Sequence, residues 1–503
     1  MRTLMVWGCT SGAGKSLVAT ALVRLAARRG IAVAPFKAQN MSNNARVVRR
    51  VAPAGERDGG WGEIGSAQYL QALAAGVEPG TDHNPVLLKP ERDTASQVIV
   101  HGRVEPALGK LGWRARSATL AAAAQAAFDR LAARHALVVV EGAGSPAEPN
   151  LAPDDYVNLE VLRWAARHGP VDALLVADID RGGAFAHFWG TWSLLPDDLR
   201  PRLRGFVANK FRGDASLLAP APQWLAERTG VPLVAVLPML ADHGLPEEDG
   251  WFGAPPAAAA RSGERRRVAI VAWPRLANLD EFAPLAASPG LRLRWVRRAD
   301  ELAADDLIVL PGSKQVSGDL EWLRAAGFET ALAAHVRAGG AVLGICGGLQ
   351  MLGLRIVDRD GFDGVAGVDI AGLGLLPVVT RYVERKHLAR RDARFAALEG
   401  AWSPWSGLAA GGYEIRHGRT DELPGADARV ALRADDGSVL GWQQGAVLGV
   451  CLHGLFEQPA LVAALAGAAP AAGHESAFDR IADAFEAACD PALLEALFTG
   501  DRR

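Results

Sequence analysis

The sequence predicts an α/β fold with two domains, a P-loop domain with a doubly wound, mostly parallel sheet followed by a different α/β domain. Short β-rich apolar runs alternate with helical patterns in both halves of the chain. The first apolar run leads into a glycine-rich loop ending in Gly14-Lys15-Ser16, and a later one ends in Cys346 followed by two glycines. A chain of 503 residues is also too long for one ordinary domain.

Composition excludes several classes of protein. The chain is 50% hydrophobic with a formal net charge of −2, so nothing favours binding to nucleic acid or an anionic membrane. No apolar stretch reaches about 18 uncharged residues, so no membrane-spanning helix is expected. The N-terminus is expected to be a first strand and not a signal peptide. The 4 cysteines form no CxxC pair, and the 11 histidines show no zinc spacing. So few cysteines in a chain of this length do not indicate a disulfide framework, which predicts a cytoplasmic protein. A homo-oligomer is possible.

The first domain is predicted to span residues 1–253. Its strands are expected at Leu4–Cys9, Ala32–Lys37, Gln97–His101, Leu137–Glu141, Ala173–Asp178, Gly205–Asn209 and Leu233–Val236. Its helices are expected to begin at Lys15, Glu63, Ala118 and Gln223. This alternation is typical of a parallel sheet with helices on both faces.

A break in composition follows at residues 254–266, which lack apolar periodicity and are predicted to form a linker. The second domain is predicted to span 267–503. Its strands are expected at Val268–Ala272, Leu293–Val296, Leu307–Leu310, Ala341–Ile345, Gly374–Val379, Val430–Leu432, Val439–Gln443 and Val447–Leu452. A helix is expected near Asp319–Arg337, and a helix pair from about Pro459 to Phe498.

The loop from Gly8 to Ser16 predicts a nucleotide site, although Cys9 stands where the usual GxxxxGK[ST] pattern begins with glycine. Gly8 gives the longer spacing Gly-x5-Gly-Lys-Ser. The loop's N–H groups and the following helix N-terminus can hold phosphate oxygens. Lys15 can neutralise the phosphates of ATP, and the Ser16 hydroxyl can ligate Mg²⁺. The loop glycines assigned to this site are Gly8, Gly12 and Gly14. A glycine-rich turn without a nucleotide is the alternative.

Charged residues elsewhere in the first domain extend this interpretation. Lys37 ends the second strand, where a second cation can face the phosphates. Glu63 at an expected helix start and Glu141 at a strand end can contribute carboxylates to the metal site. A simple helix-terminal charge is the alternative for Glu63. The candidates for substrate contacts are Asp178, Asp180 and Arg181.

The segment Leu343–Gln350 predicts a nucleophile elbow. The strand carries Cys346 to the carboxyl edge of the sheet, and the N–H of Gly347 can stabilise an oxyanion. We expect a second oxyanion donor in the strand-end turn at Gly312. The expected base is His453, at the end of a later apolar strand. A buried core thiol and a core histidine are the alternatives.

Several strings in the first half carry a family resemblance. The phosphate loop, Lys37 and Glu141-Gly142-Ala143-Gly144 are similar to the dethiobiotin synthetase family, whose members use ATP to activate a carboxylate. Five longer strings resemble the cobyric acid synthase family: Pro35–Ser42, Asn84–Pro90, Ser96–Val100, Glu141–Glu148 and Asp178–Gly183. The resemblance implies that Asn209 lies near the nucleotide base.

The second half resembles the class I glutamine amidotransferases, on the string Gly344–Gly353 around Cys346. Those enzymes usually carry a glutamate two residues after the histidine, where this chain has Leu455. We therefore expect a modest glutaminase, because no residue identifiable in the sequence orients the imidazole. Within Gly412–Gly418, which resembles another family string, Glu414 and His417 are candidate helpers near the glutamine pocket.

The resemblance implies an ATP-dependent carbon–nitrogen ligase of cobalamin biosynthesis, with glutamine as the amido donor. Its implied corrinoid substrate is adenosylcobyrinic acid a,c-diamide, amidated at the b, d, e and g carboxylates. The nearest alternative is a sister ligase, cobyrinic acid a,c-diamide synthase, with the same two modules. A more distant alternative is a non-catalytic P-loop ATPase switch with a degenerate amidotransferase module.

Overall fold

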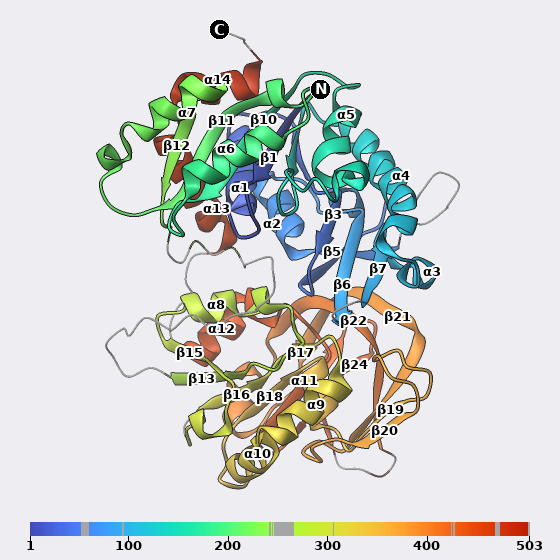
Figure 1. Cartoon of the computed structure of the whole chain (residues 1–503). Coiled ribbons are helices and arrows are strands. Elements are labelled where there is room, and N and C mark those ends of the chain that lie inside the picture. Colours follow the sequence, from blue (N-terminus) through green and yellow to red (C-terminus); the bar gives the residue numbers. More distant parts are fainter. Residues whose placement is uncertain are drawn as a thin grey trace. The chain divides into compact units, whose positions relative to one another are not determined.

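The structure, a computed structural model, describes residues 1–51, 60–92, 95–240, 243, 245, 266–304, 306–423, 425, 428–467 and 473–500. The chain forms two compact units (Figure 1). The first comprises Met1–Ser42, Val48–Asp249 and Ala472–Arg503, and the second comprises Asn43–Val47 and Gly250–Ala471. The predicted linker at 254–266 lies outside the described residues except for Arg266, which begins β13.

The first unit is built on a six-stranded parallel sheet with the order β12-β11-β10-β1-β9-β2. Its strands are β1 (Arg2–Gly8), β2 (Val33–Phe36), β9 (Leu137–Glu141), β10 (Val171–Asp178), β11 (Leu203–Phe211) and β12 (Leu233–Pro238). The strands are continuous apolar runs because helices cover both faces. The carboxyl ends of β1, β9 and β10 therefore meet at one edge, where the predicted phosphate loop lies.

The helices of this unit divide between two apolar cores, one on each face of the sheet. One core contains residues of α4 (Trp113–Ala132), α5 (Val161–Ala165) and α6 (Ala184–Leu194). The other contains residues of α1 (Lys15–Arg28) and α2 (Ser66–Ala74). This part of the chain also contains α3 (Pro106–Gly109) and α7 (Ala221–Thr229). No helix within the described ranges is long and apolar enough to cross a membrane.

The prediction of a helix that begins at Glu63 is wrong. Glu63 lies in β5 (Trp61–Gly65), and α2 begins only at Ser66. The extended conformation is held by the Glu63 N–H, which donates to the Gly102 carbonyl at 3.2 Å. The smaller strands of this part of the chain are β3 (Gln39–Met41), β4 (Ala45–Arg49), β6 (Val86–Arg92), β7 (Ala95–Val100) and β8 (Arg103–Val104).

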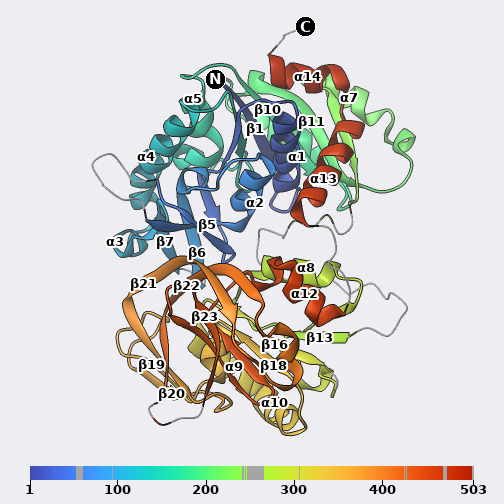
Figure 2. The ribbon, with the colours of Figure 1, turned by 180° about the vertical axis from the view of Figure 1, so that it is seen from behind.

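The last two helices of the chain belong to the first unit. The sequence instead predicts that they lie in a second domain that spans residues 267–503. Figure 2 shows α13 (His474–Ala488) beside α1, with α14 (Pro491–Thr499) following it. Phe478, Ile481 and Phe485 are buried in the same core as α1. Arg24 and Arg28 of α1 form ion pairs with α13, to Asp479 (2.8 Å) and Asp483 (2.6 Å) respectively. The amphipathic pattern predicts such helices but does not indicate which sheet they cover.

The second unit has an eleven-stranded sheet, in the order β15-β13-β16-β18-β25-β24-β23-β21-β19-β20, with β22 paired to β21. The parallel part contains β13 (Arg266–Val271), β15 (Leu291–Val296), β16 (Leu307–Leu310), β18 (Val342–Ile345) and β25 (Val447–Val450). The other strands are β19 (Arg355–Asp358), β20 (Val368–Ala371), β21 (Val378–Phe395), β22 (Ala409–Glu422), β23 (Arg429–Ala434) and β24 (Val439–Gln444). A separate pair joins β14 (Leu276–Ala277) to β17 (Gly312–Ser313). The helices are α8 (Ala283–Ala287), α9 (Val316–Ala325), α10 (Phe328–Arg337), α11 (Gly347–Leu352) and α12 (Pro459–Ala466).

Two predicted elements of this unit are wrong. The single helix expected near Asp319–Arg337 is two helices, α9 and α10, separated by Gly327 in the left-handed conformation (φ +79°). The strand expected at Gly374–Val379 begins at Val378 and continues for 18 residues as β21. Much of β21 is charged and only partly buried, so its sequence lacks the apolar alternation that would have revealed it.

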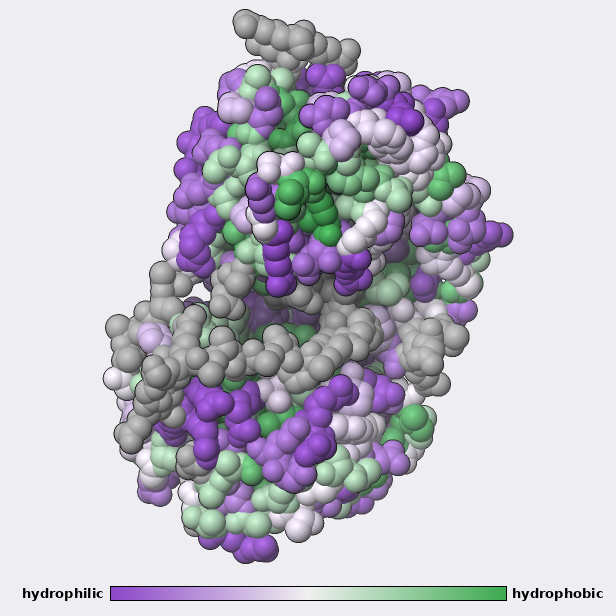
Figure 3. Space-filling model, turned by 60° about the vertical axis from the view of Figure 1, so that its left-hand side comes forward, coloured by the Kyte–Doolittle hydropathy of each residue, from purple (hydrophilic) through white to green (hydrophobic). Residues whose placement is uncertain are grey.

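A partly exposed aromatic cluster lies on the first unit. Figure 3 shows one side of the protein, where hydrophobic and hydrophilic side chains are mixed over the surface. Trp189 and Trp192 of α6 stack with ring centroids 5.4 Å apart, and Trp224 of α7 lies 6.1 Å from Trp189. Trp189 is 36% exposed and Leu194, on the same helix, 55%. Exposed apolar clusters of this kind commonly mark binding surfaces.

Candidate active site

The predicted phosphate loop connects β1 to α1 in the first unit. Lys15 folds back across Gly8, where an added Cβ would lie 2.9 Å from the Lys15 Cγ. The Lys15 ammonium donates to the carbonyls of Thr10 and Gly144, both at 3.1 Å. The lysine is therefore held within the loop, where a phosphate would meet its charge.

Asn209, at the end of β11, supports this loop. Its amide nitrogen donates to the Ala13 carbonyl at 3.0 Å. A Cβ at Gly14, whose φ is +101°, would lie only 1.9 Å from that nitrogen, so the close contact requires glycine. The structure thus brings Asn209 to the phosphate loop, and its expected contact with the nucleotide base stays a prediction.

Glu141 is the centre of a buried polar cluster at the end of β9. Its Oε1 accepts hydrogen bonds from the Ser16 hydroxyl and the Lys37 ammonium, both at 2.9 Å. Its Oε2 accepts from Gln71 Nε2 at 2.5 Å. The structure therefore brings together three residues that the sequence predicted separately, and adds Gln71, which the sequence analysis missed.

The donor atoms of this cluster fit Mg²⁺. The Ser16 hydroxyl and the Glu141 carboxylate are oxygen ligands of the kind that Mg²⁺ prefers. Gln71 Oε1 is buried and has no hydrogen-bond partner among the described residues. Those residues contain no group of three or more His, Cys, Asp or Glu side chains suited to a metal ion. A bound Mg²⁺ would thus also use phosphate oxygens and water, as is usual for this ion.

The other predicted metal ligand and the substrate candidates lie in separate ion pairs. Glu63 is buried with its Oε2 2.5 Å from Lys89 Nζ. Asp178 Oδ2, at the end of β10, lies 3.0 Å from Lys210 Nζ, which also donates to the Gly12 carbonyl of the phosphate loop. The remaining pairs are Arg181 with Asp178 (3.4 Å) and Asp180 with Arg212 (3.3 Å). Asp178 is thereby linked to the loop through Lys210, a residue that the sequence analysis did not assign.

Cys346 occupies a strained turn between β18 and α11. Its backbone has φ +50° and ψ −100°, which is unusual for a residue with a side chain and is characteristic of a nucleophile elbow. Its N–H donates to the Val450 carbonyl at 2.8 Å. A Cβ at Gly348 would lie 1.9 Å from the Leu310 carbonyl oxygen, so glycine is required for the turn to pack on β16. The local sequence therefore builds the elbow that the motif predicted.

His453 meets a carboxylate that lies far from it in the sequence. Its Nδ1 is 3.1 Å from Glu281 Oε1, and the Gly454 N–H donates to Glu281 Oε2, also at 3.1 Å. Both side chains are buried. With Nδ1 engaged by Glu281, Nε2 is the nitrogen left to interact with Cys346. The expectation that nothing orients the imidazole is thus wrong.

The charge state of His453 follows from these neighbours. Burial alone would lower its pKa, but the Glu281 carboxylate and a hydrogen-bonded Cys346 outweigh that effect and raise the pKa from 6.5 to about 10. Tyr413 stacks on the imidazole with ring centroids 5.4 Å apart, and exchanges two backbone hydrogen bonds with His453. The imidazolium form is therefore stabilised in a fixed orientation.

The two glycines predicted for the oxyanion site lie close to His453 and to β17, respectively. A Cβ at Gly312 would lie 2.9 Å from His453 Cε1, and one at Gly347 would lie 2.7 Å from the Ser313 nitrogen. The short strand β17 that carries Gly312 is held by Trp273 Nε1, which donates to the Gly312 carbonyl at 3.2 Å. Their role as oxyanion donors stays a prediction.

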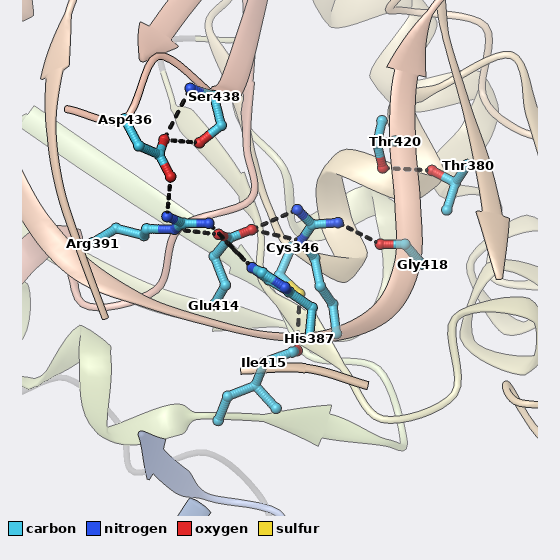
Figure 4. A network of polar contacts seen from close by, with 11 residues as sticks. Cys346, Thr380, His387, Arg391, Glu414, Ile415, Gly418, Thr420, Asp436 and Ser438 are labelled. Carbon is cyan, nitrogen blue, oxygen red and sulfur yellow. Dashed lines mark hydrogen bonds and ion pairs between the residues drawn. The ribbon is translucent and has the colours of Figure 1, made fainter. Parts of the chain in front are cut away.

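A buried ionic network lies next to the nucleophile (Figure 4). Glu414 accepts hydrogen bonds from His387 (3.0 Å), Arg391 (2.9 Å) and Arg416 (2.8 Å). Burial opposes ionisation of Glu414, but these bonds lower its pKa to about 2. The Cys346 thiol points toward the Ile415 carbonyl, 3.8 Å away on the same strand as Glu414. Glu414 is thus a permanently ionised anchor for Arg416 beside the nucleophile.

His417, the other candidate helper, stacks on Phe362 with ring centroids 5.7 Å apart. Its Nδ1 lies 3.1 Å from the Val383 carbonyl. The described contacts thus fix the ring against β21 and a neighbouring loop, and a helper role for His417 stays a prediction.

The fold and these two sites define a two-module enzyme that joins a P-loop nucleotide-binding unit to a glutamine amidotransferase unit. Residues 4–249 match the CobQ/CobB/MinD/ParA nucleotide binding domain, and residues 267–461 match the CobB/CobQ-like glutamine amidotransferase domain. The chain belongs to the cobyric acid synthase family, as the following relatives show.

The cobyric acid synthase of Paracidovorax citrulli (strain AAC00-1) is 55% identical, with 98% of each chain covered. That of Polaromonas sp. (strain JS666 / ATCC BAA-500) is 52% identical, with 99% of this chain and 98% of the relative covered. Among solved structures, a glutamine amidotransferase with 19% identity aligns with 40% of this chain and 100% of its own, with a TM-score of 0.30.

Proposed function

We propose that this chain amidates the b, d, e and g carboxylates of adenosylcobyrinic acid a,c-diamide, using ATP, Mg²⁺ and glutamine. One observation carries the proposal: a complete Cys346–His453–Glu281 triad and a Ser16–Lys37–Glu141 cluster occur in one chain. The first arrangement suits ammonia release from an amide, and the second suits phosphoryl transfer. Their combination also argues against a non-catalytic ATPase switch.

The amidotransferase unit releases ammonia through a covalent intermediate. His453, stabilised as the imidazolium, already holds the proton given up by Cys346, and the sulfur attacks the side-chain carbonyl carbon of glutamine. The N–H groups near Gly347 and Gly312 stabilise the oxyanion, and the imidazolium gives its proton to the departing ammonia. Water then hydrolyses the thioester to glutamate. Glu281 holds the imidazolium in place throughout, because its carboxylate lies on Nδ1.

The nucleotide-binding unit activates the carboxylate. A corrinoid carboxylate oxygen attacks the γ-phosphorus of ATP, so that ADP leaves and an acyl phosphate forms. Lys15 and Lys37 bring positive charge to the phosphates, while Ser16 and Glu141 would hold Mg²⁺, which neutralises phosphate charge when bound. Ammonia then attacks the acyl carbon, phosphate leaves, and the amide nitrogen loses a proton to water.

The ion-paired cluster at the end of β10 supports the assignment of substrate contacts. Asp178 ends β10 and is joined through Lys210 to the phosphate loop. Asp180 and Arg181 lie on the turn that follows this strand. We assign these residues to the corrinoid. The four cysteines are free, in keeping with a reducing cytoplasm as the site of action.

Mass spectrometry of the corrinoid product tests the proposed substrate. With ATP, Mg²⁺ and glutamine, adenosylcobyrinic acid a,c-diamide should show four successive replacements of OH by NH₂. Cobyrinic acid itself should not be amidated at its a and c groups. Amidation of cobyrinic acid with no reaction of the diamide would instead identify the sister ligase.

A further inference from the structure

A short segment from the N-terminal part of the chain is part of the second unit. Residues Asn43–Val47 lie there, whereas the residues on either side of them in the sequence belong to the first unit. Arg46, in the middle of this segment, is only 2% exposed. Burying a guanidinium is costly unless its charge is matched, so the partners of Arg46 indicate what the segment does.

Arg46 is held by two carboxylates and a ring. Its Nε donates to Asp280 Oδ2 at 2.7 Å, and its terminal nitrogens bond to Asp280 and Glu457. Its guanidinium carbon lies 5.2 Å from the centroid of the Tyr413 ring. A fork-shaped cation suits this arrangement because it bridges two carboxylates while stacking on an aromatic face.

A reciprocal pair of asparagines fixes the same segment beside Asp280. The Asn44 side-chain oxygen accepts from the Leu279 N–H, and the Asn278 side-chain oxygen accepts from the Ala45 N–H, both at 3.0 Å. Leu279 begins the short 3-10 helix Leu279–Phe282. The segment therefore caps the turn that carries Asp280 and the triad residue Glu281.

Two of the three groups that hold Arg46, Asp280 and Tyr413, are connected to His453. Asp280 directly precedes Glu281, whose carboxylate lies on His453 Nδ1. Tyr413 stacks on the His453 ring and forms two backbone hydrogen bonds with it, at 2.9 and 3.1 Å. A movement of Arg46 would therefore displace both the Glu281 carboxylate that contacts His453 Nδ1 and the Tyr413 ring that stacks on the imidazole.

We propose that Arg46 is a positioning residue for the glutaminase reaction, acting on His453 through Asp280–Glu281 and Tyr413. The inference rests on the proposed glutaminase role of Cys346 and His453. It assigns part of the amidotransferase site to a residue that lies outside the matched amidotransferase domain, residues 267–461.

Glutaminase kinetics of the full-length Arg46→Met and Arg46→Lys variants test this role. Arg49→Met is the matched control, because Arg49 lies on the same strand but stacks on Trp61. Arg46→Met should lower the glutaminase kcat at least 10-fold with less than a 3-fold change in KM for glutamine. Arg46→Lys should recover part of kcat, and Arg49→Met should match the unchanged enzyme. The ratio of variant to unchanged enzyme tests Arg46, whereas glutaminase activity of the unchanged enzyme tests the proposed function.

Amidation driven by added ammonia separates positioning from folding. Under the proposal, Arg46→Met retains ammonia-driven amidation within 2-fold while its glutaminase falls. An unchanged glutaminase kcat in Arg46→Met would overturn the proposal. So would an Arg46→Lys variant with full kcat beside an Arg46→Met variant that loses both activities, because the residue would then serve only to balance buried charge.

Discussion

Glu281 Oε1 lies 3.1 Å from His453 Nδ1, which completes a triad from a residue 172 positions earlier in the chain. In the class I amidotransferase pattern the corresponding glutamate is expected two residues after the histidine, where this chain has Leu455. The carboxylate thus reaches the imidazole from a different element, a 3-10 turn after β14. Position in space decides the role, because a triad is defined by its geometry and not by its sequence order.

Replacing Glu281 by glutamine should impair glutamine hydrolysis selectively. Without the carboxylate, the imidazole loses its orienting partner and kcat should fall about 10²- to 10⁴-fold. Ammonia-driven amidation should be retained. Steady-state glutaminase assays check this, with Glu399→Gln as the control because Glu399 is exposed and paired with Arg429. Full glutaminase activity in Glu281→Gln would show that the observed pair has no catalytic consequence.

The same substitution should change how stability depends on pH. His453 has a folded-state pKa of about 10 against an ordinary 6.5, so its stabilising contribution is complete below pH 6.5 and disappears as the pH rises through 10. Removing the Glu281 charge lowers the pKa of His453. Urea unfolding between pH 6 and pH 10 should therefore show a smaller loss of stability with rising pH in Glu281→Gln than in the unchanged protein.

Lys37→Met should disable the nucleotide-dependent reaction and leave the glutaminase intact. The substitution removes a cation from the phosphates and also removes the buried ion pair between Lys37 and Glu141. Loss of one member of a buried pair costs about 3–5 kcal/mol, so the free energy of unfolding should also fall. Corrinoid-dependent ADP release, measured beside glutamate formation, checks the separation. Loss of both activities in a folded variant would contradict it.

Asp319 is expected to make stability fall as the pH rises from about 4 to about 7. Burial raises its pKa from 3.8 to about 7, although hydrogen bonds from Ser313 and Arg275 oppose the shift. The folded protein therefore holds the extra proton between these pH values, and the contribution to stability is lost as the pH rises through 7. Relative to Asp319→Asn, the unchanged protein should lose up to about 1.4 kcal/mol per pH unit there. Parallel urea-unfolding curves at pH 4 to 8 would contradict the shifted pKa.

Removal of residues 473–503 should destabilise the first unit and spare the second. The deletion exposes the face of α1 on which Phe478, Ile481 and Phe485 pack, and removes the ion pairs of Arg24 and Arg28. Calorimetry should show a lower midpoint for the unfolding of the nucleotide-binding unit. Glutaminase activity is the control and should persist. Equal destabilisation of both units would contradict the assignment of these helices.

The local parts of each site could be predicted from sequence because their chemistry is contiguous. The phosphate loop lies within Gly8–Ser16, and the elbow within Leu343–Gln350, so strand, turn and helix are read together. Glu141 could be predicted because a charged residue that closes an apolar strand has few structural reasons to be there, and His453 because a cysteine nucleophile needs a base. The central βα alternation could also be predicted, because each strand and helix is a contiguous pattern in the sequence.

The partners that come from distant segments could not be predicted. Nothing around Glu281 or Gln71 identifies either as the neighbour of a site residue, since each is brought there by tertiary packing. Arg46 lies outside every string that carries the family resemblance, and only the structure assigns it to the second unit, where it contacts Asp280. The amphipathic helix α13 fits either sheet by its pattern, and only packing on α1 assigns it.

The most direct test of coupled chemistry in one chain compares Cys346→Ala with the unchanged enzyme on adenosylcobyrinic acid a,c-diamide, ATP and Mg²⁺. The account predicts that the unchanged enzyme forms the fourfold amide with glutamine or ammonia. The variant should form it only with ammonia, because the nucleotide-binding unit activates carboxylates without the thiol. Glutamine-driven amidation by Cys346→Ala, or no amidation by either protein with ammonia, would contradict the account.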